Sequence, residues 1–344
     1  MKKAVLFVLG IVLSCVAYPQ TDSSKVHWLT FEQVKAKFFQ KKKPILVFIY
    51  SDDCDSCQMM LNTTFGNAEV AKYIDYYFYP IRFDARSYDS VTFFNGSKFI
   101  HQPGQEYHSL VYTFLHDSIR FPAMVMFNKY GQGEVFYGFR NRDHIFPLLI
   151  YYSEEVYTTT KYPDFEKVYF KAYPPGAKQV ITRLFIHWKK PEEADKLMKQ
   201  HPRKIFIDVY DRYRVTQTIM RLQVYNNPVI AAYLNSHFYP VSVEARWEDT
   251  VYFHDTPFPP STKYPYHTLA IDLLAGKMKF PAFVFLDSTY KLIDREHVFL
   301  MPEDFYRLAV YIGDDYYKTM TFKEFLKEHG ADMEEKIKQI KKYY

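Results

Sequence analysis

The segment from Ile45 to Cys57 constrains the fold of this chain more than any other. An unbroken apolar run, Ile45–Tyr50, leads into Ser51-Asp52-Asp53-Cys54-Asp55-Ser56-Cys57, and helix-like sequence follows. This order predicts a buried strand, a turn, and a helix that begins at Cys54. The partial positive charge at a helix N-terminus stabilises a thiolate, so the pKa of such a cysteine falls from about 8.5 into the range of about 3.5–7.5. Two sulfurs at this spacing can also close a small disulfide ring.

A metal site is the first alternative for this pair of thiols. Zinc needs four ligands, which two Cys-x-x-Cys pairs or one pair with spaced histidines usually supply. The chain has three cysteines, and the third, Cys15, lies far from the pair. His101, His108 and His116 show no ligand spacing. We therefore predict redox chemistry without a metal, and a purely structural disulfide stays open as the second alternative.

The first residues indicate export. Met1-Lys2-Lys3 is basic, and the apolar run from Ala4 to Val16 is too short to span a bilayer. Cleavage after Ala17 fits the small-residue rule, and we assign residues 1–20 to a signal peptide. A competing interpretation is a lipobox at Val12–Cys15, in which Cys15 would carry a lipid and provide the only membrane anchor. Both interpretations predict a periplasmic protein, and a single thiol pair in an exported chain is typical of redox function.

Composition excludes little else. The net charge of +5 over 344 residues is small and spread along the chain. No basic stripe indicates nucleic acid as a partner. The chain is rich in aromatic residues, with 32 Tyr and 31 Phe, which fits either a packed core or an aromatic binding surface. No Gly-x-Gly-x-x-Gly run is present for a flavin or nicotinamide, so no cofactor is expected.

The chain contains the same pattern twice. His27-Trp28 recurs as His187-Trp188, an offset of 160 (188 − 28), and the register then holds for well over a hundred residues. Further matches include Phe78-Tyr79-Pro80 with Phe238-Tyr239-Pro240, Tyr107-His108 with Tyr266-His267, and Phe121-Pro122-Ala123 with Phe280-Pro281-Ala282. A period of this length means duplicated domains rather than a solenoid. We place the linker near Tyr173–Gly176.

Each repeat alternates predicted strands and helices. In the first repeat we expect strands at 45–50, 79–84, 123–127 and 134–139, the last two being antiparallel, and helices at 55–65, 68–77, 107–115 and 143–155. Asn67 and its counterpart Asn227 are the expected N-caps, and Pro228 occupies a favoured first helical position. This order predicts an α/β unit with a central mixed sheet flanked by helices.

These residues resemble the thioredoxin superfamily over nearly all of both repeats. The specific elements are the strand, the Cys54-x-x-Cys57 motif with its helix, and Phe121-Pro122 before a later strand. Thr64–Ala71 with Phe78-Tyr79-Pro80 is similar, more narrowly, to exported bacterial thioredoxin-like proteins related to the DUF255 family. The resemblance implies that Pro122 is cis and faces the dithiol, and that Phe121 binds an extended substrate segment. It divides the chain into thioredoxin-like domains at 21–172 and 173–344.

The sequence departs from the family pattern near the thiols. Asp53 replaces the usual Trp, and Asp52, Asp53 and Asp55 surround the pair, so we expect them to raise the pKa of Cys54 against the effect of the helix. The buried acid that the family places six residues before the first cysteine is Phe48 in the first repeat. The second repeat keeps an acid there, Asp208, but has Arg214 and Gln217 in place of the cysteines. Two explanations are open for this exchange of acid and thiols between the repeats. Either both sites have drifted, or the second repeat has become a binding or docking domain.

The sequence therefore predicts an exported thiol-disulfide oxidoreductase. Cys54 would attack a substrate disulfide and Cys57 would resolve the mixed disulfide. Its partners would be protein disulfides and an unidentified thiol reductant that recycles the pair. The alternative is a non-catalytic binding protein of the same fold in which the Cys54–Cys57 disulfide is only structural. Arg214 is interpreted either as a solvated arginine or as a binding place for an acidic group on a partner.

Overall fold

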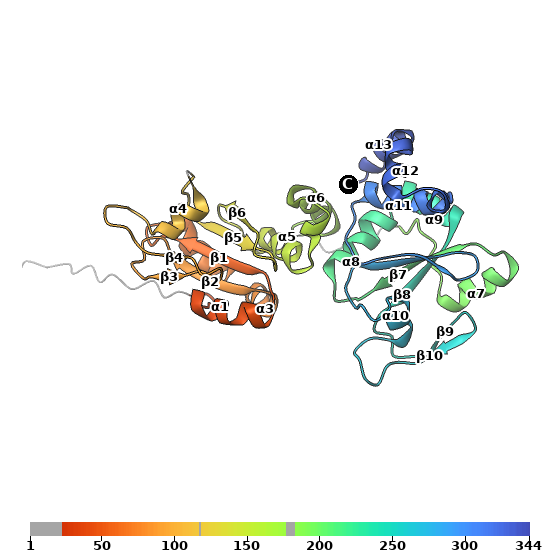
Figure 1. Ribbon diagram of the computed structural model, residues 1–344, viewed down its shortest axis with the longest axis horizontal. Helices are drawn as coiled ribbons and strands as arrows, with labels where there is room; N and C mark the ends of the chain where they lie inside the picture. The colour runs from red at the N-terminus through yellow and green to blue at the C-terminus, as the bar shows by residue number, and fades with distance from the viewer. Residues whose placement is uncertain (1–22, 117, 177–182) are drawn as a thin grey trace, which may run out of the picture.

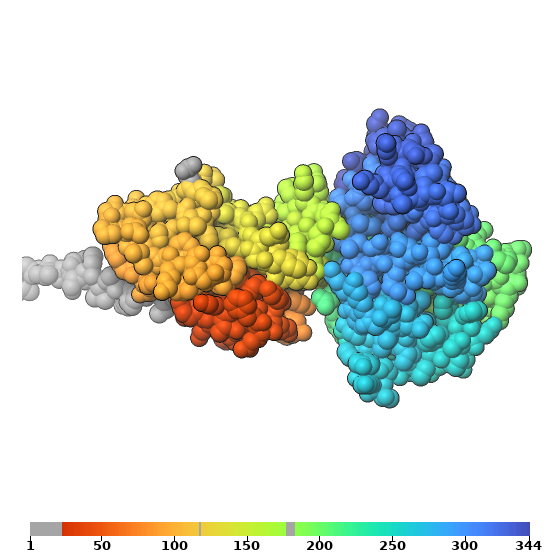
Figure 2. Space-filling view, in the orientation of Figure 1, coloured from red at the N-terminus to blue at the C-terminus, as the bar shows by residue number. Residues whose placement is uncertain are grey.

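The protein forms two α/β domains that lie side by side. The computed structural model describes residues 23–116, 118–176 and 183–344, so the expected signal peptide and Cys15 lie outside the described residues. Figure 1 shows the first domain in warm colours and the second in green and blue, with the helices near residues 142–172 between them. The space-filling view shows two lobes joined through this region (Figure 2).

The first domain is built on a four-stranded mixed sheet with the order β2-β1-β5-β6. Strand β1 pairs in parallel with β2 and antiparallel with β5, and β5 pairs antiparallel with β6. Every residue of β1 except its last is buried, as the unbroken apolar run predicts. The strands are β1 (Ile45–Tyr50), β2 (Tyr79–Asp84), β5 (Ala123–Phe127) and β6 (Gly133–Tyr137), with a small hairpin of β3 (Val91–Thr92) and β4 (Lys98–Phe99).

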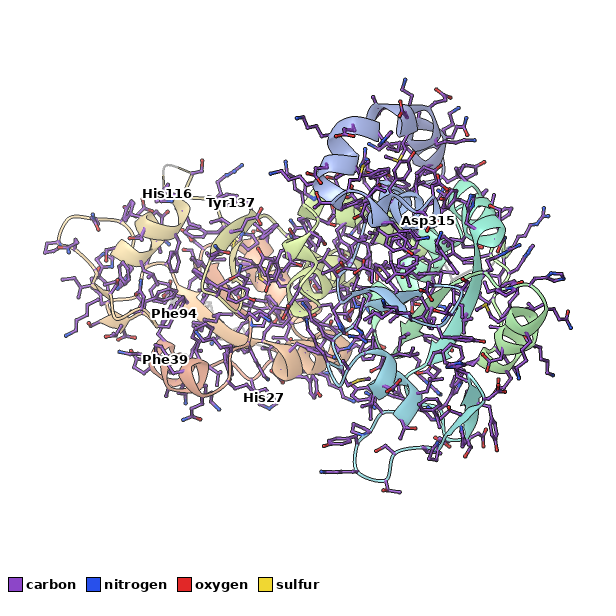
Figure 3. The ribbon with its side chains drawn as sticks, turned by 45° about the vertical axis from the view of Figure 1, so that its right-hand side comes forward. His27, Phe39, Phe94, His116, Tyr137 and Asp315 are labelled. Carbon is purple, nitrogen blue, oxygen red and sulfur yellow. A yellow bond between two sulfur atoms is a disulfide. The ribbon has the colours of Figure 1, made fainter. Side chains whose placement is uncertain are left out.

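Helices cover both faces of this sheet, because separate apolar clusters lie on its two sides. Asn67 caps α3 by accepting hydrogen bonds from the backbone N–H groups of Glu69 and Val70. The helices are α1 (Phe31–Gln40), α2 (Asp55–Met59), the π-helix η1 (Met60–Thr64), α3 (Ala68–Tyr77), α4 (Ser109–Leu115), α5 (Arg142–Ser153), the short η2 (Val156–Thr158) and α6 (Tyr162–Ala172). Figure 3 shows the side chains of both lobes, with the rings of Phe39, Phe94 and Tyr137 labelled in the first domain.

The second domain repeats this plan, with the sheet order β12-β11-β7-β8. Its strands are β7 (Lys204–Tyr210), β8 (Phe238–Glu244), β11 (Ala282–Leu286) and β12 (Leu292–Glu296), with a hairpin of β9 (Val251–Phe253) and β10 (Thr256–Phe258). Its helices are α7 (Pro191–Gln200), α8 (Val215–Ile219), π-helix η3 (Met220–Tyr225), α9 (Pro228–His237), α10 (Thr268–Leu273), α11 (Pro302–Gly313), η4 (Tyr316–Lys318), α12 (Phe322–His329), η5 (Ala331–Met333) and α13 (Glu334–Lys341).

Most predicted elements are confirmed, with four differences. The helix predicted at 55–65 is α2 followed by a π-helical turn, and the one predicted at 107–115 begins two residues later because His108 is its N-cap. The last helix of the first repeat is followed by a further helix, α6, which the sequence analysis missed. It also missed α1, which starts with a capping box between Thr30 and Gln33.

The two domains share one apolar cluster. Residues of α5 and α6 and residues of η3, α9 and α11 belong to the same group of buried side chains. The rings of Phe165 and Phe299 lie 5.5 Å apart across the interface. The Thr159 hydroxyl donates a hydrogen bond to the Phe299 carbonyl oxygen, and Glu155 forms ion pairs with Lys129 of its own domain and Lys279 of the second. The domains are therefore packed against each other rather than loosely tethered.

Candidate redox site

The two thiols of the first domain lie where β1 passes into α2, and they form a disulfide. Cys54 is the N-cap of α2, and its sulfur accepts a hydrogen bond from the Cys57 backbone N–H at 3.1 Å. Cys57 is fully buried against the apolar cluster, whereas Cys54 is partly exposed. Solvent and a substrate can therefore reach the sulfur of Cys54 but not that of Cys57.

Polar side chains form a network beside Cys54. The hydroxyl of Ser51, which is fully buried, donates to Asp53 and accepts from Arg86 at 2.7 Å. The Arg86 guanidinium forms ion pairs with Asp53 at 2.9 Å and with Glu106 at 3.0 Å. The hydrogen bond from Ser51, followed by Arg86, lowers the pKa of Asp53. One of the three carboxylates near the thiols is therefore paired with a cation, whereas Asp52 and Asp55 are exposed.

Phe121 and Pro122 directly precede β5, the strand that pairs with β1. The Phe121-Pro122 peptide bond is cis, as is Phe280-Pro281 in the second domain. Strand register pairs Ala123 with Ile49, so Pro122 stands opposite the end of β1. Pro122 is buried, whereas Phe121 is partly exposed and its ring lies 5.4 Å from that of Tyr107. Among the described residues, none forms a hydrogen bond with the backbone of Phe121.

The second domain has a different set of side chains at the equivalent turn. Gln217 takes the place of Cys57 and bridges two groups, donating to the Asp208 carboxylate and accepting from the Ala282 backbone N–H at 3.1 Å. Arg221 forms an ion pair with Asp208 at 3.0 Å and lies over the Tyr210 ring. Burial raises the pKa of Asp208 to about 6, although Arg221 and Gln217 act against this rise. The buried acid is thus bonded into the core.

An acid of the first domain bonds to the helix start that follows Arg214, the counterpart of Cys54. Glu154, which directly follows α5, is buried and accepts hydrogen bonds from the backbone N–H groups of Val215 and Thr216 at 3.2 and 3.0 Å, and from the Thr216 hydroxyl. Burial raises the pKa of Glu154, and the nearby Arg214 guanidinium acts against the rise. Glu154 thus bonds to the helix start that follows Arg214, and the turn of the second domain is an inter-domain contact.

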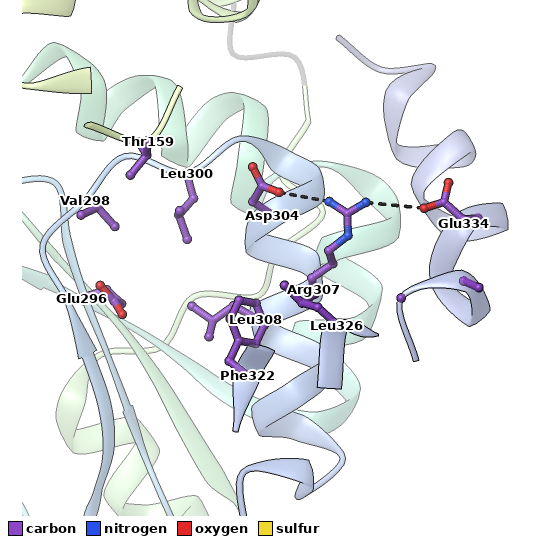
Figure 4. A pocket seen from close by; sticks show the side chains of 12 residues that line it. Thr159, Glu296, Val298, Leu300, Asp304, Arg307, Leu308, Phe322, Leu326 and Glu334 are labelled. Carbon is purple, nitrogen blue, oxygen red and sulfur yellow. Dashed lines mark hydrogen bonds and ion pairs between the residues drawn. The ribbon is translucent and has the colours of Figure 1, made fainter. Parts of the chain in front are cut away.

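A separate cavity of about 670 Å³ lies in the second domain. Figure 4 shows Arg307 in its wall, joined to Asp304 and Glu334. These two carboxylates neutralise the guanidinium, so it does not present a free anion-binding group. Apart from Thr159, its lining residues belong to the second domain, and neither cysteine lines it.

Sequence reasoning missed three residues of the network, namely Ser51, Arg86 and Glu106. The repeat contained a signal for one of them, because Arg86 and Arg246 stand at the same register. Arg246 pairs with Asp211, the counterpart of Ser51, through two bonds of 3.0 and 2.9 Å. Both domains therefore tie this arginine to the residue at the end of the central strand.

Among the residues that the structure describes, no group of three or more His, Cys, Asp and Glu side chains could hold a metal ion. Within the same part of the chain, no helix is long and apolar enough to cross a membrane.

Comparisons with known proteins assign the first domain. The family model described as "Thioredoxin-like domain" matches residues 31–153, and no curated protein matches the chain. Together with the Cys54–Cys57 pair, this match identifies residues 31–153 as a domain of the thioredoxin superfamily. The second domain has the same sheet order and the same cis proline, so the chain carries two tandem thioredoxin-like domains.

Solved structures with some similarity include three proteins. A thioredoxin-fold protein from Helicobacter pylori is 14% identical, with 52% of this chain and 97% of that chain covered and a TM-score of 0.30. A thioredoxin from Thermus thermophilus is 18% identical, with 38% and 88% covered and a TM-score of 0.28. The DsbD C-terminal domain of Neisseria meningitidis in its reduced form is 18% identical, with 35% and 90% covered and a TM-score of 0.25. The assignment above rests on the family model and the topology.

Proposed function

We propose that this protein is an exported thiol-disulfide oxidoreductase in which Cys54 exchanges with substrate and Cys57 resolves. The observation that carries the proposal is the disulfide at a strand-to-helix turn of a thioredoxin-like domain, with one sulfur accessible and the other buried. Phe121 supports it, because a partly exposed residue without backbone hydrogen bonds, just before the strand that pairs with β1, suits an added substrate strand. Export rests on the sequence of residues 1–20 alone.

The proposed reaction moves two electrons. In the reduced protein, the Cys54 thiolate attacks one sulfur of a substrate disulfide, and the other substrate sulfur leaves as a thiolate that takes up a proton. The Cys57 thiolate then attacks the sulfur of Cys54 and releases the second substrate thiol. The substrate disulfide is reduced to two thiols, and the protein ends as the Cys54–Cys57 disulfide. An external thiol reductant returns it to the dithiol.

Two measurements test this proposal. Insulin reduction in the presence of dithiothreitol should be faster with the protein than without it, and Cys54→Ser should abolish the difference. Cys57→Ser should instead accumulate a mixed disulfide with the substrate, visible by mass spectrometry, because no second thiol releases it. If the wild-type dithiol exchanges no faster than free dithiothreitol, the disulfide is structural and the binding-protein alternative replaces the proposal.

A further inference from the structure

Carboxylates dominate the exposed charge around the redox disulfide. Asp52, Asp53 and Asp55 flank Cys54 in the chain, and all three are exposed. Glu106 joins them in space, because Arg86 forms ion pairs with both Glu106 and Asp53. Among the described residues, Asp52 and Asp55 have no hydrogen-bonding or ion-pairing partner for their side chains. A substrate that approaches Cys54 therefore meets two unpaired negative charges.

Positive charge at this surface does not balance the carboxylates. Arg86 is the cation of the network, and it is shared between two of the acids. Arg82 is a second cation nearby, and its guanidinium lies over the Tyr50 ring. This surface thus has four carboxylates, Asp52, Asp53, Asp55 and Glu106, against the guanidiniums of Arg86 and Arg82, although the whole chain has a net charge of +5. The sign of this surface is opposite to that of the protein.

The second domain shows that the fold does not need these acids. Its residues at the four equivalent positions are Arg212, Tyr213, Val215 and Pro265. That domain folds into the same sheet and turn without a carboxylate at any of the four. Within this chain the acids accompany the thiols and are absent where the thiols are absent, which points to a role in the exchange reaction rather than in folding.

We propose that the redox site of the first domain selects disulfides that carry positive charge next to the sulfur atoms, such as disulfides in lysine- or arginine-rich segments. This inference rests on the proposed function and names its substrate class. Attraction between Asp52, Asp55 and a cationic substrate raises the rate of encounter and holds the substrate near Cys54, and an anionic substrate is repelled. The reaction itself is unchanged: the substrate disulfide becomes two thiols, and the dithiol becomes a disulfide.

Three small disulfides of different charge test the idea on the reduced full-length protein. Cystamine is cationic, hydroxyethyl disulfide is neutral and dithiodipropionate is anionic. Second-order rate constants for oxidation of the dithiol are measured by stopped flow for the wild type and for the double variant Asp52→Asn/Asp55→Asn. Because the three substrates differ in intrinsic reactivity, the decisive quantity is the change in the cystamine-to-dithiodipropionate ratio between the two proteins. Glu248→Gln/Glu328→Gln, two exposed acids of the second domain, is the matched control.

Each lost charge should slow cystamine about twofold and speed dithiodipropionate about twofold, so it changes their ratio by about fourfold. We therefore expect the double variant to lower this ratio by about sixteenfold at low ionic strength. In the wild type, salt at about 0.5 M should lower the ratio similarly, since it screens exposed charges. The control should leave the ratio unchanged.

Two results would overturn the inference while leaving the proposed function intact. The first is a ratio that stays within about twofold of wild type although hydroxyethyl disulfide is reduced normally. The second is a parallel change in all three rates, which would mean that the acids act on the Cys54 thiol and not on the substrate. If the wild type does not react with hydroxyethyl disulfide faster than a free dithiol does, the proposed function itself fails.

Discussion

Replacing Glu154 by Ala tests whether the redox-equivalent turn of the second domain is a structural contact between the domains. The Glu154 carboxylate accepts three hydrogen bonds, from the backbone N–H groups of Val215 and Thr216 and from the Thr216 hydroxyl. Thr216 is fully buried, so its donors have no water to replace the lost acceptor. Each unsatisfied buried donor costs about 1–3 kcal/mol, and Arg214 would lose its negative neighbour.

The expected loss in free energy of unfolding is about 3–5 kcal/mol, the range found when one partner of a buried charged pair is removed. Partial opening of the interface to water would reduce this loss of stability. The opening itself would then be detected as faster proteolysis of the segment between the domains. Urea unfolding followed by circular dichroism measures the first effect, and limited trypsin digestion measures the second.

Two variants make the Glu154 experiment decisive. Asp164→Asn removes a partly exposed acid of α6 that forms an ion pair with Lys167, and it should change stability by less than about 1 kcal/mol. Glu154→Met/Arg214→Met removes both charges, and it should be less destabilising than the sum of the single changes, because no charge stays buried alone. Wild-type stability and wild-type proteolysis in Glu154→Ala would refute the interpretation of this contact.

Two further predictions concern the networks. The pKa of Asp208 is raised to about 6 in the folded protein, above the ordinary value of 3.8, so the folded state binds more protons than the unfolded state between these values. The contribution of Asp208 to stability should therefore be greatest below about pH 4 and fall by up to about 3 kcal/mol as the pH rises through 6, so Asp208→Asn should remove this component from the pH dependence in urea titrations. Arg86→Ala leaves Asp53 and Glu106 without their cation, so it should raise the pKa of Cys54 and slow the reaction with hydroxyethyl disulfide several-fold at pH 7. Raising the pH should restore that rate, and a pH-independent loss would contradict the electrostatic explanation.

Regular periodicity explains which parts of the fold were predictable from sequence. The buried strand β1 and the capped helix α3 follow from local signals, namely an unbroken apolar run and an Asn at the N-cap. Helix α6 was missed although Pro163 lies in its first turn, because its apolar face packs on the other domain and had no expected partner. The π-helical turn η1 carries no sequence signal that distinguishes it from the helix it continues.

Only those residues of the candidate site that are contiguous in sequence could be predicted. Cys54, Cys57 and the three aspartates are contiguous, so the motif itself reveals them. Arg86 comes from the end of another strand, and its partner Glu106 follows 20 residues later, so only tertiary structure brings both to Asp53. The link between Glu154 and α8 spans 62 residues and two domains, and no local pattern encodes it.

The two strand-to-helix turns of this protein show how loss of the thiols and domain docking are connected. A helix start exposes backbone N–H groups that need an acceptor. In the first domain the sulfur of Cys54 accepts from the turn and stays open to solvent. In the second domain the counterpart of Cys54 is Arg214, whose side chain has no acceptor atom. Glu154 of the first domain instead supplies a carboxylate that accepts hydrogen bonds from the next two backbone N–H groups.

The repeat also shows why this docking happens once. Asp314, the counterpart of Glu154, is satisfied within its own domain by Tyr233 and His237. Of these two acids, only Glu154 bonds to the other domain. The helix start that it contacts has no thiols. Docking occupies the degenerate turn and leaves the turn that carries the disulfide free for a substrate.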